Sequence, residues 1–457
     1  MHRLSVRYLL VAAVVSLLTV IALSYSSATF SNFVPQAGQN HSALQRNSYL
    51  QGSDDVYLLL KTGAVSLYER TPLHVQTTFS QLPHYAIYSD APGTVAGIAV
   101  LDALANITSA TLGSDAMQAY RRQRELLAEN ANVDFTDTKA HIDKAWDLDK
   151  WKPLPIAAHA YSQHPQFKWY IIMDDDSYII WPNMLRWLST LNPSDSLYIG
   201  APAVINGEPF AHGGSGVVLS HGLVSSVFPS HPGITHEWEA FTAENCCGDH
   251  VFAHALAEIG VSLNSGPVHS RLQGDAPTSV RLSKDNWCSE IVSFHHVSPR
   301  EIENLYIFEN LYGSSHNPIL YRDIYSHFVK PYITDFRREN WDNGADDREY
   351  NIDDSEVEEI AHRSYEDCKA RCVDWSDCLQ FRYKPEFCAL ASRVRLGSIA
   401  EVGSDEDEAF SSEWMVERIR NMRGELQCEK VGVDEEEEGS FFRNSPLAVK
   451  ASEGDSA

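Results

Sequence analysis

The chain has 457 residues, with 36 Lys and Arg against 62 Asp and Glu, and a formal net charge of −26. This length excludes a single small module and accommodates one large domain or two unequal ones, each with its own core. The acidic balance argues against nucleic acid or an anionic membrane surface as the main partner, because both repel a negatively charged protein. The composition is that of a soluble ectodomain.

The N-terminal segment departs from this soluble pattern. Residues 8–23 are nearly all apolar and follow Arg3 and Arg7. A run of this length fits a thin bilayer, and basic residues on its N-terminal side orient the N-terminus towards the cytoplasm. A cleaved signal peptide is the alternative, since residues 24–28 are small and polar. We expect an uncleaved transmembrane helix at 8–25, with the rest of the chain in the lumen of the Golgi or another secretory compartment.

Glycosylation sequons and cysteines agree with this location. Asn40 and Asn106 each begin a sequon, although such short patterns are common by chance. Five of the eight cysteines lie between residues 362 and 428, which indicates disulfide pairing in an oxidising compartment.

The composition changes along the chain. From Val56 to Leu219, short apolar runs alternate with amphipathic helical stretches, which is typical of an α/β domain with a largely parallel sheet. Acidic residues dominate after Tyr332, and cysteines follow. We expect these regions: a cytoplasmic tail (1–7), a transmembrane helix (8–25), a stem (26–53), the main α/β domain (54–335), an acidic linker (336–361), a small cysteine-rich module (362–428) and a disordered acidic tail (429–457).

Three adjacent carboxylates follow one of the predicted hydrophobic strands. Residues 169–173 suit a strand buried on both faces, and Asp174, Asp175 and Asp176 come directly after it. Ligands of α/β sheets bind at the carboxyl ends of strands, and a divalent cation relieves the repulsion among carboxylates and can bridge a diphosphate. A solvated acidic turn is the alternative, but the second apolar stretch at 178–181 argues against it. The triplet therefore predicts a metal and diphosphate site.

Three glycines form a second motif. Gly213, Gly214 and Gly216 precede a predicted strand at 217–219. Glycine permits positive φ and lets a ligand approach the backbone closely, although a plain tight turn explains these residues equally well.

Asp249 and a histidine pair complete the candidate residues. Asp249 lies at the start of a predicted helix that ends at Gly260, where an N-cap role suffices to explain it. A general base that takes a proton from a hydroxyl is the functional alternative. His295 and His296 follow Phe294, and their imidazoles are either polar surface or core groups or ligands of a Mn²⁺-like ion.

Taken together, these motifs resemble glycosyltransferase family 31, the fringe-like and core-galactosyltransferase-like enzymes, and more closely its fungal branch with a cysteine-rich tail. The resemblance runs from about Val56 to Tyr332 and rests on these points: LLLKTG at 58–63, YSD at 88–90, WDLDKWKPL at 146–154, the aspartate triplet with its continuation at 181–188, GGSG at 213–216, CCGD at 246–249 and FHH at 294–296. It implies a GT-A fold, a nucleotide-sugar donor, Mn²⁺, and inversion, usually with a β1,3 linkage. It also implies that Cys288 pairs with Cys246 or Cys247.

The resemblance further implies roles for individual residues. Asp176 would be a metal ligand, and His295 would supply the metal's histidine, although the neighbouring His296 leaves the register open. Asp249 resembles the family's catalytic base. The implied donor-binding residues are Arg70, Asp90, Asp175, Gly213, Gly214 and Gly216.

The C-terminal cysteines resemble those of a PAN or apple-like module. Ser364 and Asp367 form a capping box, and the i,i+4 pair Cys368 and Cys372 shares one face of the predicted helix. Such modules bind protein or carbohydrate, so recruitment of an acceptor and a purely structural role both remain open.

We therefore expect an inverting, metal-dependent glycosyltransferase that moves a hexose or N-acetylhexosamine from a UDP-sugar to a hydroxyl of a glycan or glycoprotein. A catalytically inactive glycan- or protein-binding member of the same fold is the alternative, but the triplet, Asp249 and the Phe-His pair are all present, which argues for activity. A metal-dependent hydrolase is a third reading that lacks a convincing second cluster of ligands near the triplet.

Overall fold

The computed structural model describes residues 49–130, 133, 135, 144–264, 271–312, 317–352, 360–400 and 409–428. The expected cytoplasmic tail, transmembrane helix at 8–25 and acidic tail lie outside these residues, as does most of the expected stem. Within the described ranges, no helix combines the length and apolar character needed to cross a membrane.

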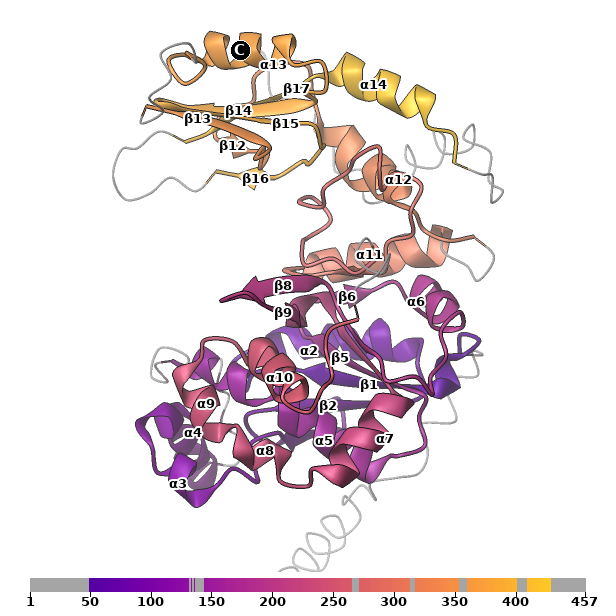
Figure 1. Ribbon diagram of the computed structural model, residues 1–457, viewed down its shortest axis with the longest axis vertical. Coiled ribbons are helices and arrows are strands. Elements are labelled where there is room, and N and C mark those ends of the chain that lie inside the picture. Colours follow the sequence, from indigo (N-terminus) through magenta and orange to yellow (C-terminus); the bar gives the residue numbers. More distant parts are fainter. Residues whose placement is uncertain are drawn as a thin grey trace, which may run out of the picture. The chain divides into compact units, whose positions relative to one another are not determined.

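A seven-stranded sheet forms the centre of the α/β region, with the strand order β3-β4-β2-β1-β5-β10-β7 (Figure 1). The four strands β4, β2, β1 and β5 run parallel, and β3, β10 and β7 pair antiparallel at the two sides. This arrangement confirms the expected mixed α/β fold with a mostly parallel central sheet. The bounds are β1 (Val56–Lys61), β2 (Tyr85–Ser89), β3 (Gly93–Val95), β4 (Ile98–Asp102), β5 (Trp169–Asp174), β7 (Tyr198–Ile199) and β10 (Val217–Ser220).

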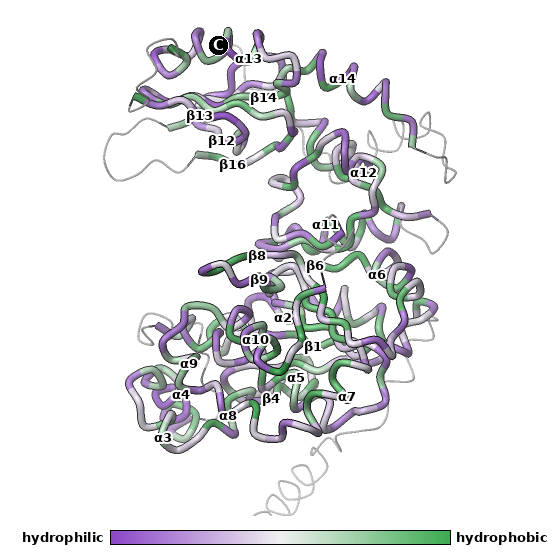
Figure 2. Tube along the Cα trace, in the orientation of Figure 1, coloured by the Kyte–Doolittle hydropathy of each residue, from purple (hydrophilic) through white to green (hydrophobic). Residues whose placement is uncertain are grey.

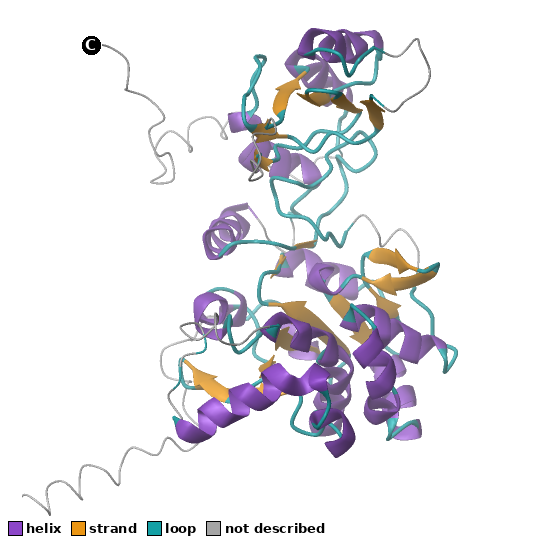
Figure 3. Cartoon of the chain, turned by 90° about the vertical axis from the view of Figure 1, so that its left-hand side faces the viewer, coloured by secondary structure: helices purple, strands orange, loops and turns teal. Residues whose placement is uncertain are grey.

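Helices cover both faces of this sheet (Figure 3). Alternate residues of a strand point to opposite faces, so Tyr57 and Leu59 join one core and Leu58 and Leu60 the other. The first core includes α5 (Pro153–Gln163), α7 (His221–Ser230) and α10 (Gly248–Ala257); the second includes α2 (Leu67–Gln76) and α6 (Trp181–Leu188). Figure 2 shows hydrophobic residues gathered along β1 and its neighbours, as burial on both faces requires.

Further helices and strands complete the α/β region. They are α3 (Ser109–Leu112), α4 (Gln118–Glu129), α8 (Ile234–Glu237), α9 (Glu239–Glu244), α11 (Pro299–Tyr312) and α12 (Tyr321–Ile324), the two-stranded pairs β6 (Tyr178–Ile179) with β11 (Ser293–Phe294) and β8 (Pro202–Ile205) with β9 (Glu208–Ala211), the 3-10 helices η1 (Ser53–Asp55), η2 (Thr78–Ser80), η3 (Asp115–Met117), η5 (Ala145–Trp151), η6 (Gly213–Ser215) and η9 (Lys330–Tyr332), and the π-helical η8 (Tyr325–Val329). The β6–β11 pair brings the segment after the triplet beside Phe294.

The C-terminal region contains a four-stranded antiparallel sheet, in the order β13-β15-β14-β17. Its elements are β12 (Trp341–Asp342), β13 (Arg348–Asn351), α13 (Tyr365–Asp374), β14 (Gln380–Lys384), β15 (Phe387–Ala391), β16 (Ser398–Ile399), β17 (Ser411–Trp414) and α14 (Val416–Glu425). β12 and β13 lie within the expected linker at 336–361, so part of that segment is folded and contributes a strand to the sheet. The expected cap is present, because the Ser364 hydroxyl accepts a hydrogen bond from the Asp367 N–H at 3.1 Å.

Disulfides join all eight cysteines. Cys368 and Cys372 share the buried face of α13, as expected, and pair with Cys388 and Cys378 respectively. The expected pairing of Cys288 with Cys246 or Cys247 is wrong. Cys288 pairs with Cys428, which lies 140 residues further along the chain, and Cys246 pairs with its neighbour Cys247. The resemblance did not cover the C-terminal region, where the chain places Cys428 beside Cys288.

Candidate active site

The aspartate triplet lies where the parallel strands end. Asp174 is the last residue of β5 and pairs in the sheet with Lys61, the last residue of β1. The next residue continues this pairing, since the Asp175 N–H donates to the Lys61 carbonyl at 3.0 Å. The hydrophobic strand therefore delivers the carboxylates to the edge of the sheet where ligands bind in α/β folds.

Two buried lysines share carboxylates along this edge. Lys61 Nζ lies 3.1 Å from Asp174 Oδ1 and also contacts Asp149 of η5. Lys152 Nζ lies 3.4 Å from Asp149 Oδ1 and 2.8 Å from Asp90 Oδ1. Both lysines are buried, so their charges are balanced by carboxylates rather than by water. A chain of ion pairs therefore connects the triplet to the end of β2.

The position of each carboxylate in this chain sets its acidity. Burial raises the pKa of Asp174 to about 6, although Lys61 opposes the change, and the charges of Asp149 and Asp176 add to the rise. Burial also acts to raise the pKa of Asp149, but Lys61 and Lys152 outweigh it and hold that pKa well below its usual range. A cation near Asp174 would favour its ionised form.

Asp175 is held by the protein itself. Its Oδ1 accepts a hydrogen bond from Arg70 at 3.0 Å, and its Oδ2 accepts from the hydroxyls of Thr62 at 2.6 Å and Ser66 at 2.8 Å. Its carbonyl oxygen lies 2.9 Å from Nε2 of the buried His74. The contact of this carboxylate with a donor stays a prediction. Asp175 anchors Arg70 and the turn that follows β1.

Asp176, His295 and His296 form a cluster with the geometry of a metal site. One ligand atom of each residue lies within 4.8 Å of the others. The His295 Nε2 is 3.2 Å from Asp176 Oδ1, and His296 Nδ1 is 4.0 Å from Asp176 Oδ2. His296 has a positive φ of 56°, which a non-glycine residue adopts only when its surroundings hold it there. Carboxylate and imidazole together form a donor set that could hold a divalent metal ion.

Charges within this cluster perturb each other. Burial acts to raise the pKa of Asp176, but the hydrogen bond and charge of His295, together with Arg70 and His296, lower it overall. Burial acts to lower the pKa of His295, but Asp176 outweighs it and raises that pKa above its usual value. The cluster thus favours an ionised carboxylate beside an imidazole.

The glycine turn makes room for this cluster. A Cβ added to Gly214 would lie 2.2 Å from Cε1 of His295, so only glycine allows the imidazole to pack there. Gly216 has a φ of 85°, in the left-handed region that favours glycine. A Cβ on Gly213 would meet nothing closer than 3.6 Å, so this residue is not sterically required. The Cβ direction of Gly214 is thus occupied by His295, while Gly213 and Gly214 both line a cavity.

Asp249 is coupled to the same turn. Its Oδ2 accepts a hydrogen bond from the Gly213 N–H at 2.9 Å, and its Oδ1 accepts from the following N–H of His250 at 2.9 Å. The expected N-cap role is wrong, because α10 begins at Gly248 with Cys247 in the cap position. Gly248 lets the backbone of α10 pack against η5, since a Cβ there would lie 2.4 Å from the Lys150 carbonyl oxygen. The helix thus starts two residues earlier than expected, and Asp249 lies in its first turn.

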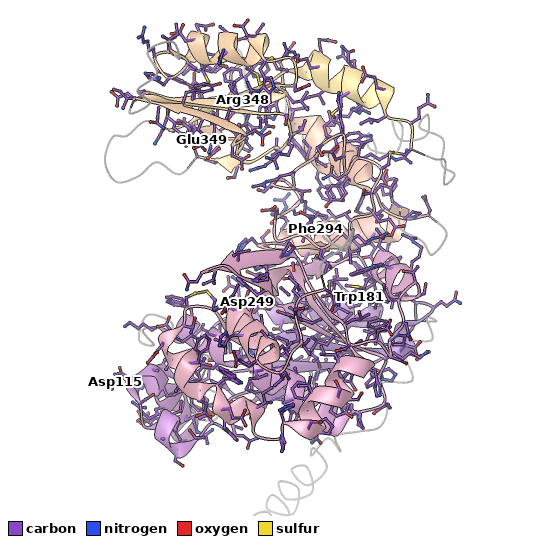
Figure 4. All side chains as sticks on the ribbon, in the orientation of Figure 1. Asp115, Trp181, Asp249, Phe294, Arg348 and Glu349 are labelled. Carbon is purple, nitrogen blue, oxygen red and sulfur yellow. A yellow bond between two sulfur atoms is a disulfide. The ribbon has the colours of Figure 1, made fainter. Side chains whose placement is uncertain are left out.

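Residues of the triplet, the histidine pair and the start of α10 line one cavity of about 250 Å³. Its lining includes Asp174 and His295 from the metal side and Asp249 from the start of α10, which Figure 4 labels. A larger cavity of about 900 Å³ lies among α5, α7 and α8 and shares Lys150 and Gly248 with the smaller one, but it contains no residue of the triplet. The smaller cavity is the candidate active site, because the groups with chemical potential line it.

The remaining expected donor residues lie around this edge. Arg70 is partly exposed, and its NH1 is 3.2 Å from Asp176 Oδ2. Asp90 is fully buried, where Gln123 at 2.6 Å and the Ala64 N–H at 3.1 Å donate to it in addition to Lys152. Asp90 is therefore part of the chain of ion pairs, and its contact with a donor stays a prediction.

Sequence reasoning missed several residues of this site. Lys61 was part of a recognised motif without an assigned role, Lys152 and Asp149 lay in another, and His74 had no signal because a single histidine in a helix is most often structural. The resemblance assigns no separate role to Asp174, yet this residue lines the cavity and Asp175 does not. The available clue was Lys61 at the end of an apolar run, since a lysine that is buried there needs a carboxylate partner.

Comparison with known proteins identifies the class and the family. The family model described as Fringe-like matches residues 51–329, which is more than half of the chain. The protein is a glycosyltransferase. It belongs to the Fringe-like family.

Among solved structures, the chain is similar to a glycosyltransferase involved in the glycosylation of the major capsid of PBCV-1. The two chains have 12% sequence identity and a TM-score of 0.22. That match covers 55% of this chain and 98% of the other. A search of the curated proteins gave no match.

Proposed function

We propose that this glycosyltransferase is an inverting, metal-dependent enzyme that moves a hexose or an N-acetylhexosamine from a UDP-sugar to a hydroxyl of a glycan or glycoprotein, forming a β1,3 linkage. One observation carries the proposal: Asp174, His295 and Asp249 line a single cavity. An inverting transfer needs a site for the leaving diphosphate and a base for the acceptor within one such space.

Asp176 and His295 are the proposed ligands of Mn²⁺, with His296 as a third ligand beside them. A bound ion would stabilise the negative charge that develops on the departing diphosphate. Arg70 supports this role, since its guanidinium contacts Asp175 and Asp176 and remains partly exposed towards the site. Gly214 keeps the His295 imidazole within reach of Asp176.

Asp249 is the proposed general base. It takes the proton of the acceptor hydroxyl while the acceptor oxygen forms a bond to the anomeric carbon, and the bond from that carbon to the diphosphate oxygen breaks with its electron pair. Attack from the opposite face inverts the configuration, so no covalent enzyme intermediate forms. The N–H of Gly213 holds Oδ2 of Asp249, which fixes the direction of the carboxylate.

We also propose that the chain is a single-pass type II protein of the Golgi membrane, with residues 8–25 as its anchor. The disulfides support a lumenal location, because such bonds persist in the secretory pathway and not in the cytosol. The C-terminal region is proposed to be a PAN or apple-like module, as in the fungal branch of the family. A helix tied to a four-stranded sheet by the Cys368–Cys388 bond supports that assignment.

The test is a donor screen on the full-length protein in detergent. Free nucleotide is measured for each UDP- and GDP-sugar, with Mn²⁺ or with EDTA, in the presence and absence of simple glycosides. We expect release from a UDP-sugar that requires Mn²⁺. Release from no donor, or release that EDTA leaves intact, would contradict the proposal and favour an inactive binding member of the fold.

A substitution of the proposed metal ligand sharpens the screen. Asp176→Asn keeps the size of the side chain but weakens its charge-assisted ligation, so Mn²⁺-dependent binding of the nucleotide is expected to be lost while the melting temperature changes little. Asp374→Asn, an exposed acidic position on α13, is the matched control and should bind as the unaltered protein does. Unchanged nucleotide binding by Asp176→Asn would show that another group holds the metal.

A further inference from the structure

Trp146 is the most exposed large hydrophobic side chain among the described residues, with 75% of its surface accessible. It lies in η5 and lines the 250 Å³ cavity that also contains Asp249. An indole gains stability from burial, so its exposure at the mouth of a site needs a reason other than folding.

The helix that carries Trp146 is fixed in place. Ala145, Leu148 and Trp151 recur every three residues along η5, and all three are buried, which leaves Trp146 on a different face. Asp149 of the same helix pairs with the two buried lysines. The Trp146 indole is therefore exposed on a helix that is itself fixed in place.

Helix η5 is also hydrogen-bonded to the segment that precedes Asp249. Lys150 Nζ donates to the carbonyl oxygens of Asn245 at 2.7 Å and Ala243 at 3.1 Å. Close packing of Gly248 against the Lys150 backbone continues this contact up to the residue before Asp249. Trp146 and Asp249 thus belong to two segments whose separation is set by several contacts.

Other residues of the cavity lining are apolar or uncharged. Cys246 and Cys247 line the cavity, and because they are bonded to each other they present a disulfide rather than thiols. Pro153 and Phe252 line it as well. The lining also contains the polar groups Asp249 and His212, so the cavity offers both apolar and polar contacts.

From this arrangement we propose that Trp146 is the platform of an acceptor subsite for a neutral pyranoside. A pyranose ring has one face rich in C–H groups and hydroxyls around its rim. Its C–H face packs on the indole, and a rim hydroxyl then points towards Asp249. A neutral sugar fits better than an anionic one, because the lysines of the lining, Lys61 and Lys150, are outnumbered by the carboxylates Asp149, Asp174 and Asp249. The inference rests on the proposed function, since it names the acceptor class of that site.

The first test measures how much of the donor sugar is transferred to the acceptor and how much is released to water. The full-length protein is given Mn²⁺, its best UDP-sugar and, in turn, the methyl glycosides of galactose, glucose, mannose and fucose. Trp146→Ala is expected to raise the KM of the accepted glycoside at least tenfold and to lower the ratio of sugar transferred to sugar released to water by a similar factor. Trp146→Phe, which keeps an aromatic face, should stay within about threefold of the original ratio. Tyr332→Ala removes an exposed aromatic ring that does not line the cavity and is the matched control.

The second test needs no turnover. The difference in fluorescence between the unaltered protein and Trp146→Phe isolates the Trp146 indole, and titration with the same methyl glycosides in the presence of Mn²⁺ and UDP should quench it to saturation. A transfer ratio for Trp146→Ala within twofold of the original, transfer to a serine peptide but to no glycoside, or a flat titration would overturn the inference. Absence of nucleotide release from every donor would contradict the proposed function separately, while the titration would still decide the role of Trp146.

Discussion

The carboxyl edge of the central sheet and the C-terminal four-stranded sheet both hold many charged side chains, but they balance them differently. Around the C-terminal sheet, three arginines each have a different carboxylate as their nearest partner: Arg382 with Asp342, Arg393 with Asp347 and Arg395 with Asp346. At the edge of the central sheet, five carboxylates surround three permanently charged groups: Asp90, Asp149, Asp174, Asp175 and Asp176 against Lys61, Lys152 and Arg70.

This difference separates charges that hold a fold from charges that form a site. One-to-one pairs satisfy each other and leave nothing for a ligand. An excess of buried carboxylate is costly unless a proton or a cation joins it, and the raised pKa of Asp174 reflects that cost. Excess negative charge at the end of parallel strands therefore marks the site more sharply than the number of charged residues does.

Removal of the proposed base should give the largest effect. Asp249→Asn retains an oxygen for the Gly213 N–H but cannot accept a proton, so the rate of transfer is expected to fall about 10³-fold. Nucleotide affinity and melting temperature should change little, because no charge pair of the ion-pair chain is broken. Steady-state kinetics with the accepted glycoside provide the measurement. A loss of less than tenfold would remove Asp249 from the role of base.

Removal of a disulfide tests the other region. Cys368→Ala with Cys388→Ala opens a loop of 20 residues and is expected to lower the free energy of unfolding by about 3 kcal/mol. Urea denaturation, followed by proteolysis of the C-terminal region, measures this loss. Metal-dependent nucleotide release should persist at low denaturant, because the site lies at the other sheet. Loss of both together would mean that the two regions are less independent than the comparison implies.

The glycine turn offers a test within the site. Gly214→Ala places a methyl group against the His295 imidazole and should weaken Mn²⁺ binding about 10- to 100-fold by moving a proposed ligand. Gly213→Ala adds the same methyl group one residue earlier, where its nearest neighbour is 3.6 Å away, and is expected to leave Mn²⁺ affinity almost unchanged. Calorimetric titration with Mn²⁺ compares the two. Equal effects would show that His295 does not need its present position.

A buried carboxyl outside both regions gives the smallest expected effect. Burial raises the pKa of Glu309 to about 8, although Tyr178 and the Trp181 N–H, which donates at 2.9 Å, act to lower it. The folded state then binds a proton that the unfolded state has released. The stabilisation is complete below a pH of about 4.5 and is lost as the pH rises towards 8, with a slope of at most about 1.4 kcal/mol per pH unit.

Glu309→Gln removes this titration while it keeps a polar group beside Tyr178. Urea unfolding at several pH values between 5 and 8 should show a flatter dependence for this variant than for the unaltered protein. Identical slopes would show that another group controls stability in that range.

Much of this architecture follows from local sequence. Continuous apolar runs such as 169–173 predict strands buried on both faces, and the cap at Ser364 predicts where α13 begins. The triplet, Asp249 and the histidine pair were singled out because their residue types carry chemistry. Their order along the chain resembles a known family, and the match at 51–329 bears out the glycosyltransferase class.

Only the tertiary structure decided which side chains contact one another. Asp174 and Asp175 are adjacent and chemically identical, yet one lines the cavity and the other faces Thr62, Ser66 and Arg70, because successive residues at the end of a strand point in different directions. Cys288 found Cys428 across 140 residues, and Trp146 came to face the cavity of Asp249 through the packing of η5 on α10. Sequence thus determined which groups are available, and the fold, through contacts between distant segments, determined which of them meet.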